Sequence, residues 1–266
     1  MSFDTPVVMA IINCTPDSFY SGSRCRTDED ILRKAETALQ QGATILDIGG
    51  YSTRPDAGEI PEEEEWNRVE HALRLLTKAF PQAVLSIDTF RAGIAKRSVM
   101  EYGAHIVNDI SAGCLDEQML PTIARLHVPY IMMHMRGTPK TMQQQTLYTD
   151  LMTEMIDCFQ AKIDRLRTLG VSDIIIDPGF GFAKTLEQNY MLLRKMPQLQ
   201  ILDCPLLAGL SRKSMIYKLL GCTPQDALNG TTAANMLALQ NGAAILRVHD
   251  VLPAVEAIRI YRQYIQ

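Results

Sequence analysis

Eight short apolar runs, each ending in polar or charged side chains, constrain this chain more than any other feature of its sequence. The clearest lies at residues 173–182, where three successive isoleucines lead to Asp177 and then to Pro178 and Gly179. Consecutive β-branched residues indicate a strand buried on both faces, and a proline with a glycine stops it. The polar endings of the other seven runs include Asn13, Asp47, Asp88, Asn108, His134, Lys213 and His249.

Segments with helical periodicity separate these runs. We predict helices from residue 28 to about 42, from residue 61, from residue 185, and over residues 91–102, 117–126, 149–169, 213–220, 224–240 and 252–265. Strands that alternate with such helices form right-handed β-α-β units around a parallel sheet. Eight units in 266 residues favour a closed (β/α)8 TIM barrel over an open doubly wound sheet, because that barrel typically takes ~250 residues.

The chain contains no linker-like tract rich in proline, glycine and serine, so we predict a single domain over residues 1–266. In a barrel of this class the site lies at the carboxyl ends of the strands, where all the polar endings meet. The loops at residues 14–27 and 51–60 are the longest there and are the natural lids.

Local signals mark several helix starts. Asp28 is a candidate cap for the first helix, and Thr185 with Gln188 matches a capping box. The four glutamates at residues 62–65 could form a metal site. They are better explained as acids at a helix start, because Pro61 precedes them and the helix dipole favours negative charge there.

Composition limits the classes of partner. The net charge of −4 argues against a surface for nucleic acid or for an anionic membrane. Six scattered cysteines without a Cys-x-x-Cys pair argue against a zinc site and a disulfide framework, so we expect reduced thiols in a cytoplasmic protein. The first residues lack a signal-peptide pattern, and no apolar run approaches the ~18 residues of a membrane span.

Four strand endings together suggest a site for a flat nitrogen heterocycle. A carboxylate such as Asp177 or Asp88 accepts two parallel N–H bonds from an amidine-like or guanidine-like edge, such as that of a pterin. Asn108 can donate and accept, and Lys213 suits a ring carbonyl or nitrogen. The alternative is that these residues form salt bridges and caps at the barrel rim, but four converging side chains make a purely structural role less favourable.

A second group suits an anion. Arg247 and His249 are two positions apart on the last strand and therefore point the same way, and barrel closure brings Asn13 beside them. These side chains match a pyrophosphate and a partly hydrated Mg2+ ion, with Asn13 as the metal ligand. Alternatively, Arg247 pairs with Asp250. For His134, a satisfied buried histidine is favoured over a catalytic one.

At this point the motifs resemble a known family, dihydropteroate synthase. The resemblance covers nearly the whole chain, and its motifs fall in family order on the strand ends. The matching segments are residues 13–19, 47–50, 52–55, 86–88, 108–110, 133–135, 177–182, 211–214 and 247–249.

The resemblance implies a homodimeric (β/α)8 barrel that joins 6-hydroxymethyl-7,8-dihydropterin diphosphate to para-aminobenzoate and releases pyrophosphate with Mg2+. Catalytic roles would fall to Asp88, Lys213, Arg247 and His249. The pterin would contact Asp88, Asn108, Ile110, Met132, Asp177, Phe182 and Lys213. Pyrophosphate would contact Asn13, Arg247 and His249. Para-aminobenzoate would contact Asp17, Phe19, Thr53, Arg54, Pro55 and Ser214, where sulfonamides would be expected to compete.

Two segments depart from the family pattern, and both lie in the predicted lids. Tyr51 replaces a usual glutamate, and residues 20–23 replace the commoner Ser-Asp-Gly-Gly. Three rival functions remain open. A folate-dependent methyltransferase-type barrel would share the Asp88, Asn108 and Asp177 chemistry, a paralogue could bind pterins without turnover, and an unrelated barrel could act on sugar phosphates.

Overall fold

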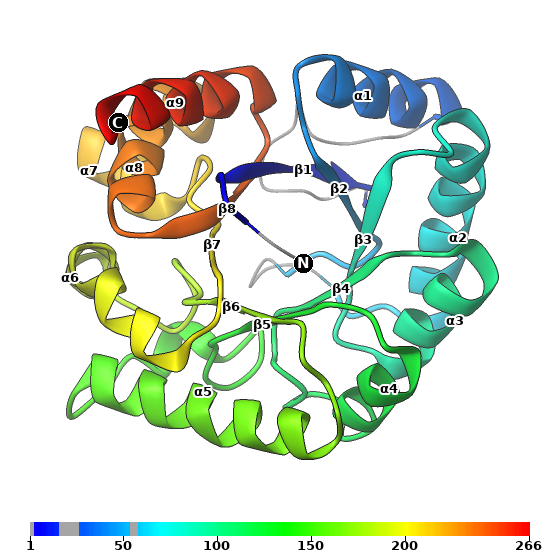
Figure 1. The fold of residues 1–266 in the computed structure, drawn as a ribbon, viewed down its shortest axis with the longest axis horizontal. Coiled ribbons are helices and arrows are strands. Elements are labelled where there is room, and N and C mark those ends of the chain that lie inside the picture. The colour runs from blue at the N-terminus through cyan, green and yellow to red at the C-terminus, as the bar shows by residue number, and fades with distance from the viewer. Residues whose placement is uncertain (1–2, 16–26, 54–57) are drawn as a thin grey trace.

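The computed structural model describes residues 3–15, 27–53 and 58–266 of the chain. Eight parallel strands close into a barrel in the order in which they occur in the sequence, and the helices surround it (Figure 1). The strands are β1 (Val7–Asn13), β2 (Ile45–Gly49), β3 (Val84–Asp88), β4 (Ile106–Asp109), β5 (Tyr130–Met133), β6 (Ile174–Asp177), β7 (Leu206–Ala208) and β8 (Ala243–Val248). The pairing of β1 with β8, which places Met9 opposite Arg247, closes the barrel. The prediction of a (β/α)8 barrel is confirmed.

The helices follow the predicted alternation. They are α1 (Asp28–Gln40), α2 (Glu62–Ala79), α3 (Ala92–Tyr102), α4 (Met119–Leu126), α5 (Leu151–Thr168), α6 (Leu186–Lys195), α7 (Ser214–Leu220), α8 (Leu228–Gln240) and α9 (Val251–Tyr264), with 3-10 turns η2 (Met142–Gln144), η3 (Met196–Leu202) and η4 (Pro224–Asp226). In the part of the chain described here, none of these helices is both long and apolar enough to cross a bilayer.

Most predicted helix starts are confirmed. Helix α2 begins directly after Pro61, and the Thr185–Gln188 capping box is present at α6. The predicted cap at Asp28 is wrong by one residue, because Thr27 takes the extended cap conformation and its hydroxyl accepts from the backbone N–H of Asp30.

The helix predicted over residues 224–240 divides into η4 and α8. Nη1 of Arg212 donates hydrogen bonds to the carbonyl oxygen of Pro224 at 2.8 Å and to that of Gln225 at 2.5 Å. In an uninterrupted helix these carbonyls would accept from the backbone four residues ahead. A distant side chain therefore sets this helix boundary.

Two apolar layers hold the barrel together. Inside it, one side chain from each of seven strands forms a cluster: Met9, Ile45, Ile106, Ile131, Ile175, Leu207 and Ile245. The larger cluster fills the space between strands and helices and takes the alternate strand positions. Phe3, the first described residue, packs against the inner cluster.

Candidate active site

The inner face of the barrel changes from apolar to polar within two to four residues along the strands, toward their carboxyl ends. Side chains at every second strand position share a face, so those two and four residues beyond the inner apolar cluster also point inward. Two residues on lie Asp47, Asn108, Asp177 and Arg247, and four residues on lie Asn13 and His249. Asp88 also points inward, because Val84, four residues before it, packs against the inner cluster. The structure thus brings the two predicted residue groups to one barrel mouth.

Arg247 connects two carboxylates inside this mouth. Its Nε donates to Oδ2 of Asp47 at 2.7 Å, and its Nη2 donates to Oδ2 of Asp88 at 2.5 Å. Burial raises the pKa of Asp88 to about 7; the Arg247 charge opposes this shift and the Asp47 charge adds to it. Within the described part of the chain Arg247 has no ion pair with Asp250, so that alternative is wrong.

Asp47 is a site residue that the sequence reasoning noticed only as a strand end. Besides Arg247, its Oδ2 accepts from Nδ2 of Asn108 at 3.0 Å, so Asp47 orients both side chains. The carboxylate is fully buried, and Oδ1 has no hydrogen-bond partner among the described residues. Its inward position, two residues after Ile45, was the available signal.

Asp177 and Lys213 meet on the opposite wall. The backbone N–H of Gly179 donates to Oδ1 of Asp177 at 2.7 Å, and Nζ of Lys213 donates to the carbonyl of Phe180 at 2.5 Å. A Cβ atom at Gly209 would lie 3.9 Å from Oδ2 of Asp177 and 3.7 Å from Nζ of Lys213, so both side-chain ends converge there. Burial lowers the pKa of Lys213 to about 8, although the Asp177 carboxylate opposes the shift.

A second buried lysine lies beneath the loop after β6 and was not singled out from the sequence. Nζ of Lys184 donates to the carbonyls of Gly179 at 3.0 Å and Phe182 at 2.9 Å, and it lies 3.2 Å from Nδ1 of His134. Burial lowers the pKa of Lys184 to about 7. His134 is itself buried and satisfied, which favours the structural interpretation of that residue.

His249 is oriented by the loop after β7. Its backbone N–H and its Nδ1 lie 3.2 and 3.0 Å from the hydroxyl oxygen of Ser211. Burial, reinforced by the charges of Lys34 and Arg247, lowers the pKa of His249 well below its ordinary value, so the imidazole is neutral. A cavity of about 250 Å³ beside β1 is lined by His249 and by α1 side chains such as Lys34.

Asn13 and Asp88 face a gap that a glycine keeps open. A Cβ atom at Gly49 would lie 3.6 Å from Oδ2 of Asp88 and 3.7 Å from Oδ1 of Asn13. Within the described ranges, no group of three or more His, Cys, Asp or Glu side chains could hold a metal ion. One amide oxygen suits a hard cation that keeps its waters and arrives with a substrate phosphate, rather than a cation held by the protein alone. The donor set fits Mg2+ on those terms.

One predicted lining residue is corrected. Met132 is fully buried and packs in the outer cluster, between strands and helices, so it does not face the mouth. Met133 follows Ile131 at the inward spacing, and its side chain lies beside Gly179. Ile110 is buried at an inward position beyond Asn108, and the ring of Phe182 lies 4.9 Å from Nζ of Lys213.

The predicted para-aminobenzoate residues are only partly described. Asp17, Phe19, Arg54 and Pro55 lie outside the described residues, as does the variant segment 20–23. Thr53 follows β2, and Ser214 begins α7 directly after Lys213.

The other departure from the family pattern, Tyr51, lies within the described residues. Its ring makes an edge contact with Phe90 at 5.0 Å between centroids, and the Arg91 guanidinium lies 5.4 Å from its centroid. These contacts give the tyrosine a defined place beside β3.

The closed barrel and the polar side chains gathered at its mouth together define a (β/α)8-barrel enzyme. The pterin binding enzyme family profile matches residues 9–249. The chain is 45% identical to the dihydropteroate synthase of Synechocystis over 92% of this chain and 85% of that protein, and 40% identical to that of Escherichia coli K12 over 96% and 90%. The crystal structure of Yersinia pestis dihydropteroate synthase with a sulfonamide drug superposes with a TM-score of 0.94 at 41% identity, covering 99% of this chain and 95% of that one.

The chain belongs to the pterin-binding enzyme family and, within it, to the dihydropteroate synthases, transferases of folate biosynthesis. The methyltransferase-type and sugar-phosphate alternatives are therefore set aside.

Proposed function

We propose that Asp177, Asp88, Asn108 and Lys213, which face one another across the mouth, hold the pterin ring. Asp177 and Asp88 would accept from the ring's amidine-like edge, Asn108 would complete the pattern, and Lys213 would face a ring carbonyl or nitrogen. The observation that carries this proposal is that Asp177 and Lys213 converge at Gly209, while Asp88 lies at Gly49. Asn108 takes an inward position on β4, two residues after Ile106. Ile110 and Phe182 would line the ring, and Met133 takes the place first expected for Met132.

Arg247, His249 and Asn13 would hold the diphosphate. Among the described residues, Arg247 uses Nε and Nη2 on Asp47 and Asp88, which leaves Nη1 for a ligand oxygen. Neutral His249, oriented by Ser211, would donate its remaining ring N–H, and Asn13 would contribute an amide. A bound Mg2+, held by Asn13 and the diphosphate, would supply further charge neutralisation at the leaving oxygens.

The proposed mechanism is a dissociative, SN1-like departure of pyrophosphate. The electron-rich dihydropterin can delocalise the cation that develops as the bond from its carbon to oxygen breaks. Asp88 and Asp177 would stabilise that cationic ring, while Arg247 would stabilise the charge gathering on pyrophosphate. The amine of para-aminobenzoate then attacks the carbon and loses a proton, in a pocket that excludes competing water. Thr53 and Ser214, with Asp17, Phe19, Arg54 and Pro55, would form that pocket.

Sulfonamides would compete for the amine pocket, in line with the drug bound to the Yersinia relative.

The proposal also includes an oligomeric state and a location. Some helix side chains are apolar and exposed on the neighbouring helices α7, α8 and α9, and they support a homodimer: Leu219, Leu220, Leu237 and Ile260. The five cysteines among the described residues are free thiols, which supports a cytoplasmic location.

The direct test is release of pyrophosphate from 6-hydroxymethyl-7,8-dihydropterin diphosphate with Mg2+, with and without para-aminobenzoate. We expect release matched one to one by 7,8-dihydropteroate. Tight pterin binding without coupled product would contradict catalysis and leave a binding protein. Absence of pterin binding would contradict the site itself.

A further inference from the structure

Arg212 holds a backbone conformation that its residue type disfavours. Its φ is +54°, and the N–H of Lys213 donates to the carbonyl of Leu210 at 3.1 Å, so Arg212 takes the third position of a tight turn. Glycine or asparagine usually fills that position when φ is positive, because other side chains cost ~1–2 kcal/mol there. A residue kept in this conformation suggests that its side chain is needed.

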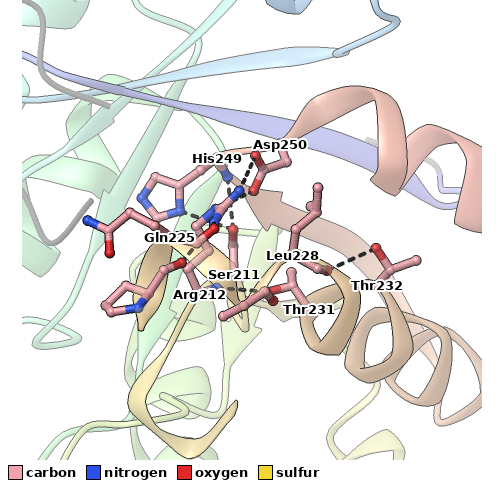
Figure 2. Close-up of polar contacts among 10 residues, drawn as sticks. Ser211, Arg212, Gln225, Leu228, Thr231, Thr232, His249 and Asp250 are labelled. Atoms are coloured by element: carbon pink, nitrogen blue, oxygen red, sulfur yellow. Dashed lines mark hydrogen bonds and ion pairs between the residues drawn. The ribbon is translucent and has the colours of Figure 1, made fainter. Parts of the chain in front are cut away.

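The guanidinium of Arg212 is almost fully buried, and through it and its backbone N–H this residue joins three elements (Figure 2). Its Nε and Nη2 donate to the two carboxylate oxygens of Asp250, at 2.8 and 2.9 Å, in a forked ion pair. Its Nη1 donates to the carbonyls of Pro224 and Gln225 in η4, and its backbone N–H donates to the hydroxyl of Thr231 in α8 at 3.0 Å.

Asp250 gives both oxygens to this fork instead of capping its own helix. It occupies the N-cap position of α9, where an aspartate normally accepts from the first turn, yet it makes no such bond. Ser211, which directly precedes Arg212, contacts His249, which directly precedes Asp250. The loop after β7 and the end of β8 are therefore joined at two successive positions (Figure 2).

We infer that Arg212 is a positioning residue that, through Asp250, fixes Lys213 on the ring side of the site relative to His249 on the diphosphate side. The inference rests on the proposed roles of those two residues. Lys213 directly follows Arg212 and His249 directly precedes Asp250, so the fork sets the spacing between the groups that face the two parts of one substrate. A ligand that spans both parts depends on that spacing, and a ligand that occupies only the ring side does not.

The test compares two ligands in the variant Arg212→Gly. Glycine accepts the positive φ, so this change removes the guanidinium without straining the turn. We would measure by calorimetry the dissociation constants of 6-hydroxymethylpterin and of its unreactive oxidised diphosphate, together with kcat and KM for the dihydropterin diphosphate. We expect the dissociation constant of 6-hydroxymethylpterin to change little. The diphosphate advantage, meaning the factor by which the diphosphate ligand binds more tightly than 6-hydroxymethylpterin, should fall by roughly 10- to 100-fold, and kcat should fall by a similar factor.

Two further variants separate positioning from folding. Arg212→Lys keeps a cation but cannot form the fork, so it should restore thermal stability without restoring the diphosphate advantage. Asp203→Gly relieves the same left-handed strain, at a φ of +50°, in the segment that enters β7, and should leave both ligands unaffected.

Equal weakening of both ligands in Arg212→Gly overturns the inference, because it indicates a merely structural role. An unchanged diphosphate advantage overturns it as well. A wild-type protein that binds both ligands equally would instead refute the proposed diphosphate roles of Arg247 and His249, and the positioning role with them.

Discussion

Nζ of Lys184 lies 3.2 Å from Nδ1 of His134, and both side chains are only 4% exposed. Burial of a base without a carboxylate contact disfavours its charged form. It lowers the pKa of His134 to about 3 and that of Lys184 to about 7. The loop that follows Asp177 therefore rests on a lysine that loses its proton near neutral pH.

The first prediction concerns stability. Between pH 7 and the ordinary lysine pKa of 10.5, unfolded chains bind a proton at Lys184 that folded chains lack, so this residue makes the free energy of unfolding rise with pH. Below pH 7 it contributes no slope. Urea unfolding of wild type and of Lys184→Met gives the difference between their free energies of unfolding. From about pH 7 to about pH 9, this difference should increase by roughly 2 kcal/mol in favour of wild type. The exposed Lys218→Met serves as control, and a constant difference would refute the shift.

A second prediction concerns the pH dependence of catalysis. The proposed role of Lys213 requires its ammonium form, and its pKa is about 8, so kcat/KM for the dihydropterin diphosphate should fall as pH rises through 8. Arginine stays charged, so Lys213→Arg should lack this fall even if its activity is lower at neutral pH. If the fall persists in Lys213→Arg, another group causes it.

The third prediction separates departure of pyrophosphate from binding of the pterin. Arg247→Ala should slow pyrophosphate release by about 100-fold or more, as for loss of one charge-stabilising donor, while 6-hydroxymethylpterin affinity changes far less. Single-turnover release and calorimetry supply the two quantities. Similar losses in both would contradict the division of roles between the ring-binding residues and the diphosphate-binding residues.

The fourth prediction uses two glycines with similar backbones. Gly179 and Gly103 have φ of +71° and +67°, but a Cβ at Gly179 would lie 2.1 Å from the carbonyl oxygen of His134, whereas at Gly103 it would meet nothing within 4 Å. Gly103→Ala should therefore cost about 1 kcal/mol of unfolding free energy, and Gly179→Ala roughly 3 kcal/mol or more. Urea unfolding checks both, and equal costs would mean that the loop after β6 yields easily.

The periodicity of the strands predicted much of the site. A strand alternates its faces, so the spacing from Ile175 to Asp177 and from Ile245 to Arg247 sufficed to point both polar side chains inward. The same rule explains the error at Met132. A slip of one position transfers a side chain to the other face, and Ile131 makes Met133 the inward residue.

Contacts between distant segments could not be predicted in this way. The fork between Arg212 and Asp250 depends on how the barrel places two loops. The remaining guanidinium nitrogen of Arg212 binds the carbonyls of η4 and so delays the start of α8. Lys184 lies in an irregular loop, where no periodic pattern marks a buried charge. Such residues become visible only when packing is known.

The ion pairs of Arg247 also have a consequence for how the protein is made. Asp47 and Asp88 precede Arg247 by 200 and 159 positions, so a ribosome completes both acids long before it adds their counter-ion. Until β8 emerges, the growing chain carries inward-facing carboxylates beside a gap between β1 and β7. The last strand thus closes the sheet and supplies the counter-ion of Asp47 and Asp88 in one step, and a prematurely terminated product would lack both.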